Sequence, residues 1–133
     1  MKKYLNVFLK VVLSLLLIMP ILGALHIFPA PTADMYTNPQ AFAFVQLMMG
    51  SASYINYIMA IVFFVALVLA WTKRMALAAL LISPIVVNIV AFHAFLDGGL
   101  FTKGSIAAVV LALLNGYFLW EQRASYAILF AKK

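Results

Sequence analysis

The sequence contains no cysteine and very little charge. Without cysteine, the chain cannot form a disulfide framework, a thiolate metal site or a reactive thiol of its own. Charged residues make up only 9% of the 133 residues, whereas a typical soluble domain has about a quarter. Such a chain cannot cover a globular surface with charge, so the composition excludes an ordinary soluble domain.

The few charges are mostly basic, with nine Lys and Arg against three Asp and Glu, which gives a net charge of +6. A basic excess can favour nucleic acid. Here, however, the basic residues occur in short clusters beside apolar stretches rather than in one patch, which argues against a nucleic-acid partner. Their simplest role is to orient the chain in a membrane and to contact anionic lipid headgroups.

Long apolar stretches are what the chain has in abundance, since 68% of its residues are hydrophobic. They predict four membrane spans, at about residues 4–27, 54–71, 76–96 and 105–120. Residues 28–53 are predicted to form an external loop with a short helix, and residues 121–133 a cytoplasmic tail. We therefore expect residues 1–133 to form a single membrane domain, an all-α antiparallel bundle of four transmembrane helices.

The basic residues also predict the orientation of the chain. If the chain crosses the bilayer four times, every Lys and Arg except Lys103 lies on one side. Cytoplasmic loops retain basic residues, so we expect both termini in the cytoplasm. The first span is similar to a signal peptide, but its apolar run continues past Ala24 without a clear cleavage site, which predicts an uncleaved span.

The segment 40–53 is ambiguous because Gln46, Gly50 and Ser51 interrupt its apolar residues. One helix from Gln40 to Trp71 would be far longer than the roughly 20 residues that cross a bilayer. We favour a short interfacial helix, a break near residues 50–53, and then the second span. The alternative, in which the segment belongs to the second span, stays open.

The third predicted span carries the most polar residues. At about 100° per residue, His93 and Asp97 lie one turn apart on the same face, so the carboxylate can orient the imidazole. Asn88 lies on a different face, and Asn115 of the fourth span is its expected partner. We expect each polar face to meet another helix rather than lipid, because an unpaired polar group is costly in hydrocarbon.

These residues have structural and functional interpretations. They can simply hold neighbouring helices together. Alternatively, Tyr57, Phe92, His93 and Phe95 can line an aromatic quinone pocket. His26 ends the first span at a depth similar to that of His93, so the two could share a haem or metal site. This is the less favoured interpretation, because a metal usually needs three or four ligands and few carboxylates are present.

No residue is assigned a catalytic role. At the end of the fourth span, Glu121 is expected to pair with Arg74, with Tyr117 within hydrogen-bonding reach. The sequence contains no nucleophile beside a base, no phosphate-binding loop and no pair of carboxylates. An enzyme that acts alone is therefore poorly supported.

Two segments resemble the DoxX-like family of small membrane proteins. The run from Ser83 to Asp97 (SPIVVNIVAFHAFLD) resembles the third-span signature of that family. The run from Leu114 to Trp120 (LNGYFLW), with Arg123 and Tyr126 after it, resembles the end of the fourth span. The residues that match the family pattern are Pro84, Asn88, Phe92, His93 and Asn115.

The resemblance implies a four-span protein of the bacterial inner membrane. Members are associated with respiratory or redox assemblies, including a small membrane subunit of a thiosulfate–quinone oxidoreductase. Some redox-linked relatives use cysteines, which this chain lacks.

Three functions follow as hypotheses. The favoured one is an accessory or anchoring subunit that connects a redox protein to the quinone pool. The second is a small solute carrier or channel whose polar path is lined by Asn88, His93 and Asn115. The third is a scaffold that binds a partner protein or lipid through residues 42–49. A homo-oligomer is also open, because small residues such as Ala78 and Ala79 allow close helix packing within or between chains.

Overall fold

The computed structural model describes residues 1–130, and every regular element in that range is helical. This confirms the all-α prediction for the described part of the chain. Lys132 and Lys133, which belong to the predicted cytoplasmic tail, lie outside the described residues. The elements are α1 (Lys2–Ala24), η1 (Ala33–Met35), α2 (Pro39–Met49), α3 (Ser53–Trp71), α4 (Met75–Phe95), α5 (Ile106–Glu121) and α6 (Arg123–Phe130).

Three of these helices, α1, α3 and α4, are long and apolar enough to cross a membrane. Their ranges correspond to the first three predicted spans. Helix α5 is apolar as well but has only 16 residues. The sequence therefore forms at least three helices with the length and composition of membrane spans.

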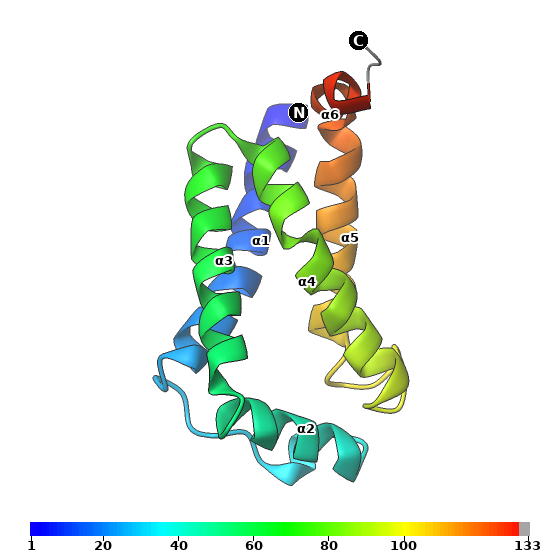
Figure 1. The fold of residues 1–133 in the computed structure, drawn as a ribbon. Coiled ribbons are helices and arrows are strands. Elements are labelled where there is room, and N and C mark those ends of the chain that lie inside the picture. Colours follow the sequence, from blue (N-terminus) through cyan, green and yellow to red (C-terminus); the bar gives the residue numbers. More distant parts are fainter. Residues whose placement is uncertain (131–133) are drawn as a thin grey trace.

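Consecutive long helices pack beside one another as antiparallel neighbours (Figure 1). Helix α3 packs against α1 and α4, α4 packs against α5, and a smaller contact between α1 and α5 closes the bundle. Alanines at these contacts allow the helix backbones to approach closely. Buried side chains of the shared core include Leu13, Leu17, Phe63, Ala66, Ala78, Ala79, Ile82, Leu111 and Phe118.

Large apolar side chains also cover the outside of the bundle. Phe64, Val87 and Leu113 are each at least 60% exposed. Extensive exposed apolar surface is unfavourable in water and marks a membrane or protein contact. The outer surface of the bundle is thus apolar like its core, as the high share of hydrophobic residues leads one to expect.

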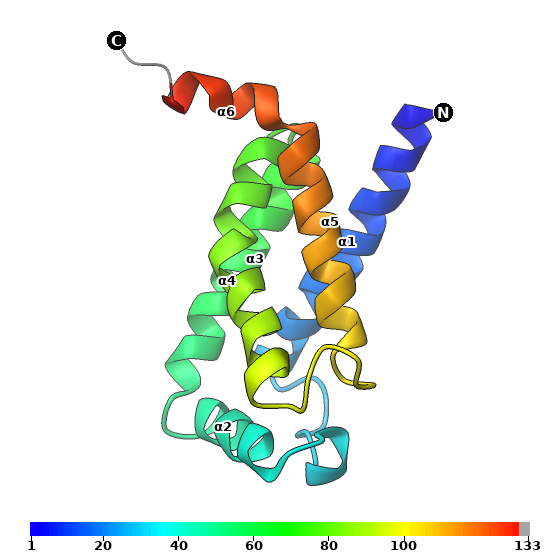
Figure 2. The same ribbon diagram turned by 90° about the vertical axis from the view of Figure 1, so that its right-hand side faces the viewer.

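Helix α2 runs across one end of the bundle, opposite the end that holds the N-terminus and α6 (Figures 1 and 2). Pro39 occupies its first turn, where a missing N–H costs nothing. Asn56 Nδ2 of α3 donates to Met48 O at 2.9 Å and holds the end of α2. The break between α2 and α3 falls at residues 50–52, within the region where the sequence predicts an interruption.

Helix α1 ends at Ala24, a few residues before the predicted boundary of its span, because the chain turns at His26. His26 adopts a left-handed φ of 55°. The backbone N–H of His26 donates to Gly23 O, and the backbone N–H of Ile27 donates to Leu22 O. These bonds form the Schellman motif that satisfies the last carbonyls of a helix.

A hydrogen-bonded network joins α1 to α5 at the end opposite α2. Asn6 Nδ2 donates to Glu121 Oε1 at 2.6 Å, and Tyr117 OH donates to Asn6 Oδ1. Gln122 donates to the second oxygen of Glu121 at 2.8 Å. The predicted pair between Glu121 and Arg74 is wrong: no ion pair joins them within residues 1–130, because α1 places Asn6 against the carboxylate instead.

Candidate functional site

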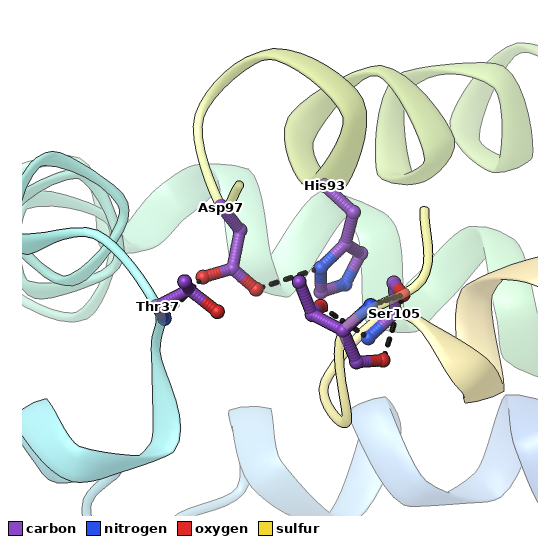
Figure 3. Close-up of polar contacts among 5 residues, drawn as sticks. Thr37, His93, Asp97 and Ser105 are labelled. Carbon is purple, nitrogen blue, oxygen red and sulfur yellow. Dashed lines mark hydrogen bonds and ion pairs between the residues drawn. The ribbon is translucent and has the colours of Figure 1, made fainter. Parts of the chain in front are cut away.

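The most buried polar cluster lies where α4 ends (Figure 3). His93 Nδ1 and Asp97 Oδ2 are 2.9 Å apart, which confirms the predicted pair. The His93 side chain is 13% exposed and that of Asp97 only 1%. This distance is that of a hydrogen bond between the imidazole and the carboxyl group. Nε2 makes no hydrogen bond with any residue in the range 1–130.

The second oxygen of Asp97 joins α4 to a distant segment. Thr37 N donates to Asp97 Oδ1 at 2.8 Å, which ties the connection between η1 and α2 to the end of α4. The sequence gives no sign of this contact because the donor is a backbone N–H. We call η1, α2 and the loop 96–105 the cap.

Two glycines make the close packing of the cap possible. Gly98 has a φ of +85°, and a Cβ at this position would lie 2.9 Å from Thr37 Cγ2. A Cβ on Gly104 would lie 3.2 Å from Asp97 Oδ2. A larger residue at either position would therefore press on the contacts of Asp97.

The loop that leads into α5 satisfies its own polar groups. Ser105 is fully buried, and its Oγ accepts from Thr102 N at 3.0 Å and donates to Thr102 O at 2.9 Å. The cap is thus a hydrogen-bonded structure in which the imidazole Nε2 has no partner among the described residues. The contacts of Asp97 and Ser105 fix the backbone segments of the cap.

Aromatic side chains fill the space between the cap and α4. Phe92 packs with ring centroids 6.4 Å from Tyr36, 5.7 Å from Phe44 and 5.1 Å from His93. Burial raises the pKa of the Tyr36 hydroxyl above its usual value, and the nearby Asp97 carboxylate raises it further. The phenol therefore stays neutral in the packed cap.

The predicted quinone pocket around His93 is not assembled. Phe92 contacts His93, but Phe95 is 85% exposed. Phe95 follows His93 by two residues, which places it about 200° away around the helix. Tyr57 belongs to a different cluster near the end of α1. The four side chains therefore do not line one cavity.

His26 lies in that other cluster, beside a cavity of about 20 Å³, which is room for a single water molecule. Its walls include Gly23, Ser53, Asn56 and Tyr57 but not His93. Within the described range, no group of three or more His, Cys, Asp or Glu side chains is placed to hold a metal ion. The geometry favours the structural interpretation of His26 as the residue that ends α1.

The expected contact between Asn88 and Asn115 is also wrong. Asn115 Nδ2 donates to Ser83 Oγ at 3.0 Å, and Ser83 in turn donates to Ala79 O. Asn88 is exposed on the outside of α4 rather than turned toward another helix of this chain. The reason is rotation: Ser83 faces α5, and Asn88 lies about 140° around α4 from it.

Asn115 keeps one unsatisfied group. The residue is 4% exposed, and its Oδ1 accepts no hydrogen bond from the described residues. A buried acceptor without a donor is uncommon in a native fold. The sequence pointed to Asn115 as a candidate site residue but did not predict that Ser83 is its hydrogen-bond partner.

Asn115 and Ser83 lie in the walls of a groove between α4 and α5. The groove has a volume of about 330 Å³ and is open on one side, where Val87 and Gly116 are exposed. Its walls are otherwise apolar. The lining residues are Ser83, Val86, Val87 and Val90 of α4 and Ala112, Asn115, Gly116 and Leu119 of α5.

The residues of the carrier hypothesis do not line a common path. His93 lies under the cap, Asn115 in the α4–α5 groove, and Asn88 on the outer surface. The segment 42–49 of the scaffold hypothesis places Phe44 and Leu47 on its exposed side, while Phe42, Val45 and Met48 are half-buried. A partner of that segment would therefore meet one face of α2, the face that carries Phe44 and Leu47.

Comparison with known proteins returned no matching family model, curated protein or solved structure.

Proposed function

We propose that the chain is a DoxX-like subunit that crosses the bacterial inner membrane four times, with both termini in the cytoplasm. Helix α5 would be the fourth span: it runs antiparallel to α4, and its 16 residues are about 24 Å long. The N-terminus, the α3–α4 turn and the start of α6 gather at one end, with Lys2, Lys73 and Arg123 (Figure 1). The loop 96–105, which carries Lys103, is at the other end (Figure 1). This supports the proposed orientation, because basic residues are retained on the cytoplasmic side.

The topology can be tested with reporter fusions. A reporter that is active only in the cytoplasm should function at both termini, and one that is active only outside should function when inserted beside Lys103. Reporters that place the two termini on opposite sides of the membrane would contradict the proposal.

We further propose that this subunit anchors a redox protein and connects it to the quinone pool. The resemblance supplies the redox assignment, and the partner would carry out the chemistry. The structural support is the α4–α5 groove, since it is apolar, open on the lipid-facing side and large enough for a quinone head group. A membrane quinone would enter it directly from the hydrocarbon.

The polar atoms of the groove indicate which redox form it would hold. Asn115 Nδ2 is engaged with Ser83, so the remaining group is the acceptor Oδ1, which is buried behind the groove wall and would meet a ligand only after a shift of the Asn115 side chain. A quinol hydroxyl donates to such an oxygen, whereas a quinone carbonyl only accepts. We therefore expect the reduced form to bind more tightly.

The test uses decylubiquinol and decylubiquinone with the protein in nanodiscs. A Cβ on Gly116 would meet no atom within 4 Å, so Gly116→Leu should fill the groove without disturbing the fold. The variant should lose at least tenfold in quinol affinity. Gly23→Leu is the matched control, because Gly23 is another helical glycine with open space around it.

The quinone assignment fails if neither redox form binds the parent protein. It also fails at this groove if Gly116→Leu and Gly23→Leu bind the quinol equally well.

A further inference from the structure

A polar side chain is exposed on the outer face of α4, at a depth where lipid would surround it. Asn88 is the fourteenth of the 21 residues in α4. It therefore lies about 20 Å from the start of the helix and about 10 Å from its end. The residues around it on this face are exposed and apolar: Leu77, Leu81 and Phe95.

This position is unfavourable for an isolated molecule in a bilayer. The hydrocarbon core is about 30 Å thick, so Asn88 is well inside it. The short asparagine side chain cannot reach the headgroup region as lysine or arginine can. No residue in the range 1–130 forms a hydrogen bond with the Asn88 side chain, although the side chains of Asn6, Asn56 and Asn115 each donate one.

We infer that the Asn88 face of α4 is the interface with a second copy of this chain. Every copy inserted in the same orientation carries Asn88 at the same depth. A twofold axis along the membrane normal then brings the two Asn88 side chains together. A carboxamide is both donor and acceptor, so the pair satisfies itself, which a lipid tail or an apolar partner helix cannot do.

The shape of the face supports close approach at this level. Pro84 and Ala91 lie on either side of Asn88 along the helix and are smaller than Leu81 and Phe95 beyond them. The interface is also separate from the α4–α5 groove, because Asn88 is about 140° from Ser83 around α4. The dimer therefore neither requires nor blocks a ligand in the groove, and it is independent of the quinone proposal.

The absence of cysteine makes the interface accessible to single-cysteine cross-linking. Leu81 lies two turns from Asn88 on the same face and is 37% exposed. Val65 on α3 is a matched control: it is 41% exposed and, like Leu81, lies six residues from the α3–α4 turn. Each residue is changed to cysteine, and native membranes are oxidised with copper phenanthroline.

We expect Leu81→Cys to form a disulfide-linked dimer with at least fivefold the yield of Val65→Cys. Adding Asn88→Leu to Leu81→Cys should reduce the yield to that of the control, because the self-complementary amides are lost. Adding Asn88→Gln should retain most of the yield, because a carboxamide is still present. Neither change is expected to unfold the monomer, since Asn88 is exposed.

The inference is overturned if Leu81→Cys and Val65→Cys cross-link equally, because this would indicate random collision. It is also overturned if Asn88→Leu leaves the dimer yield unchanged. An adduct of Leu81→Cys with a protein of another mass, in place of the dimer, would assign the face to a different partner and contradict the second-copy interface.

Discussion

At the scale of single residues, polar side chains in this chain are informative because there are so few of them. His93, Asp97 and Asn115 each contact named partners, and only particular atoms are left over. In a bundle whose helices are apolar on nearly every face, such atoms constrain the fold and any ligand more strongly than the apolar residues do.

The unsatisfied oxygen of Asn115 leads to a stability prediction. Replacing Asn115 with Leu removes a buried acceptor whose missing hydrogen bond costs about 1–3 kcal/mol. Ser83 keeps its bond to Ala79 O. We therefore expect Asn115→Leu to have the same or a higher unfolding temperature without ligand, measured by fluorescence in detergent, and to lose the preference for quinol over quinone.

Ser83→Ala is the control, since it removes the hydroxyl but leaves Oδ1 unpaired and should not stabilise the protein. Strong destabilisation of Asn115→Leu would mean that the oxygen is satisfied in the native protein and would weaken the assignment of the groove.

His26 gives a second prediction at this scale, because its backbone conformation suits glycine better than histidine. A left-handed φ is strained for residues with a Cβ and free of strain for glycine. We expect His26→Gly to raise the stability of the protein by up to about 1 kcal/mol, measured by urea unfolding in detergent. Ile27→Gly, one residue later, should bring no such gain.

A haem or metal signal that is present in the parent protein and lost in His26→Gly would show instead that this histidine is a ligand.

At the scale of elements, the sequence predicted contacts within a helix better than contacts between helices. His93 and Asp97 lie on one helix, where a spacing of four residues fixes their geometry. The partner of Asn88 depended instead on how α4 is rotated against α5. Because apolar residues lie on every side of α4 and its few polar residues point in different directions, its sequence contains no amphipathic pattern from which this rotation could be predicted.

In the cap, too, the ends of the helices were easier to predict than the contacts between them. The break between α2 and α3 could be predicted because Gly50 and Ser51 interrupt an apolar run. The contact that holds α2 in place could not, since it joins the Asp97 carboxylate to the backbone of Thr37. Backbone donors carry no residue-specific signal in a single sequence.

The cap provides the prediction at this scale. Asp97→Ala leaves Thr37 N and the His93 ring without their acceptor, and hydrogen bonds to charged groups contribute about 1.5–3 kcal/mol each. We expect faster hydrogen exchange in η1 and α2 with little change in the middle of α3, measured by mass spectrometry. Asp34→Ala, a change at an exposed acid of the same segment, is the control.

Uniform loss of protection throughout the bundle in Asp97→Ala would show that the carboxylate supports the whole fold rather than the cap.

At the scale of the whole molecule, composition predicted the class of protein and the approximate ranges of the helices. Length and apolarity are sufficient for this, because a membrane-spanning segment must satisfy its own backbone hydrogen bonds. Length and apolarity alone do not decide whether a helix as short as α5 crosses the bilayer, because crossing also depends on how far the lipid thins around the helix.

The unequal helix lengths lead to the last prediction. Helix α1 has 23 residues and α5 has 16, about 35 Å and 24 Å. A long span can tilt, whereas a short one must thin the bilayer, at a cost of fractions of a kcal/mol per Å of mismatch. If α5 spans the membrane, reconstitution in lipids with 22-carbon rather than 14-carbon chains should lower the unfolding temperature. Hydrogen exchange should then increase in α5 before α1, which serves as the internal control. Equal stability in thick and thin bilayers would contradict the assignment of α5 as the fourth span, since a helix lying outside the hydrocarbon core would not respond to its thickness.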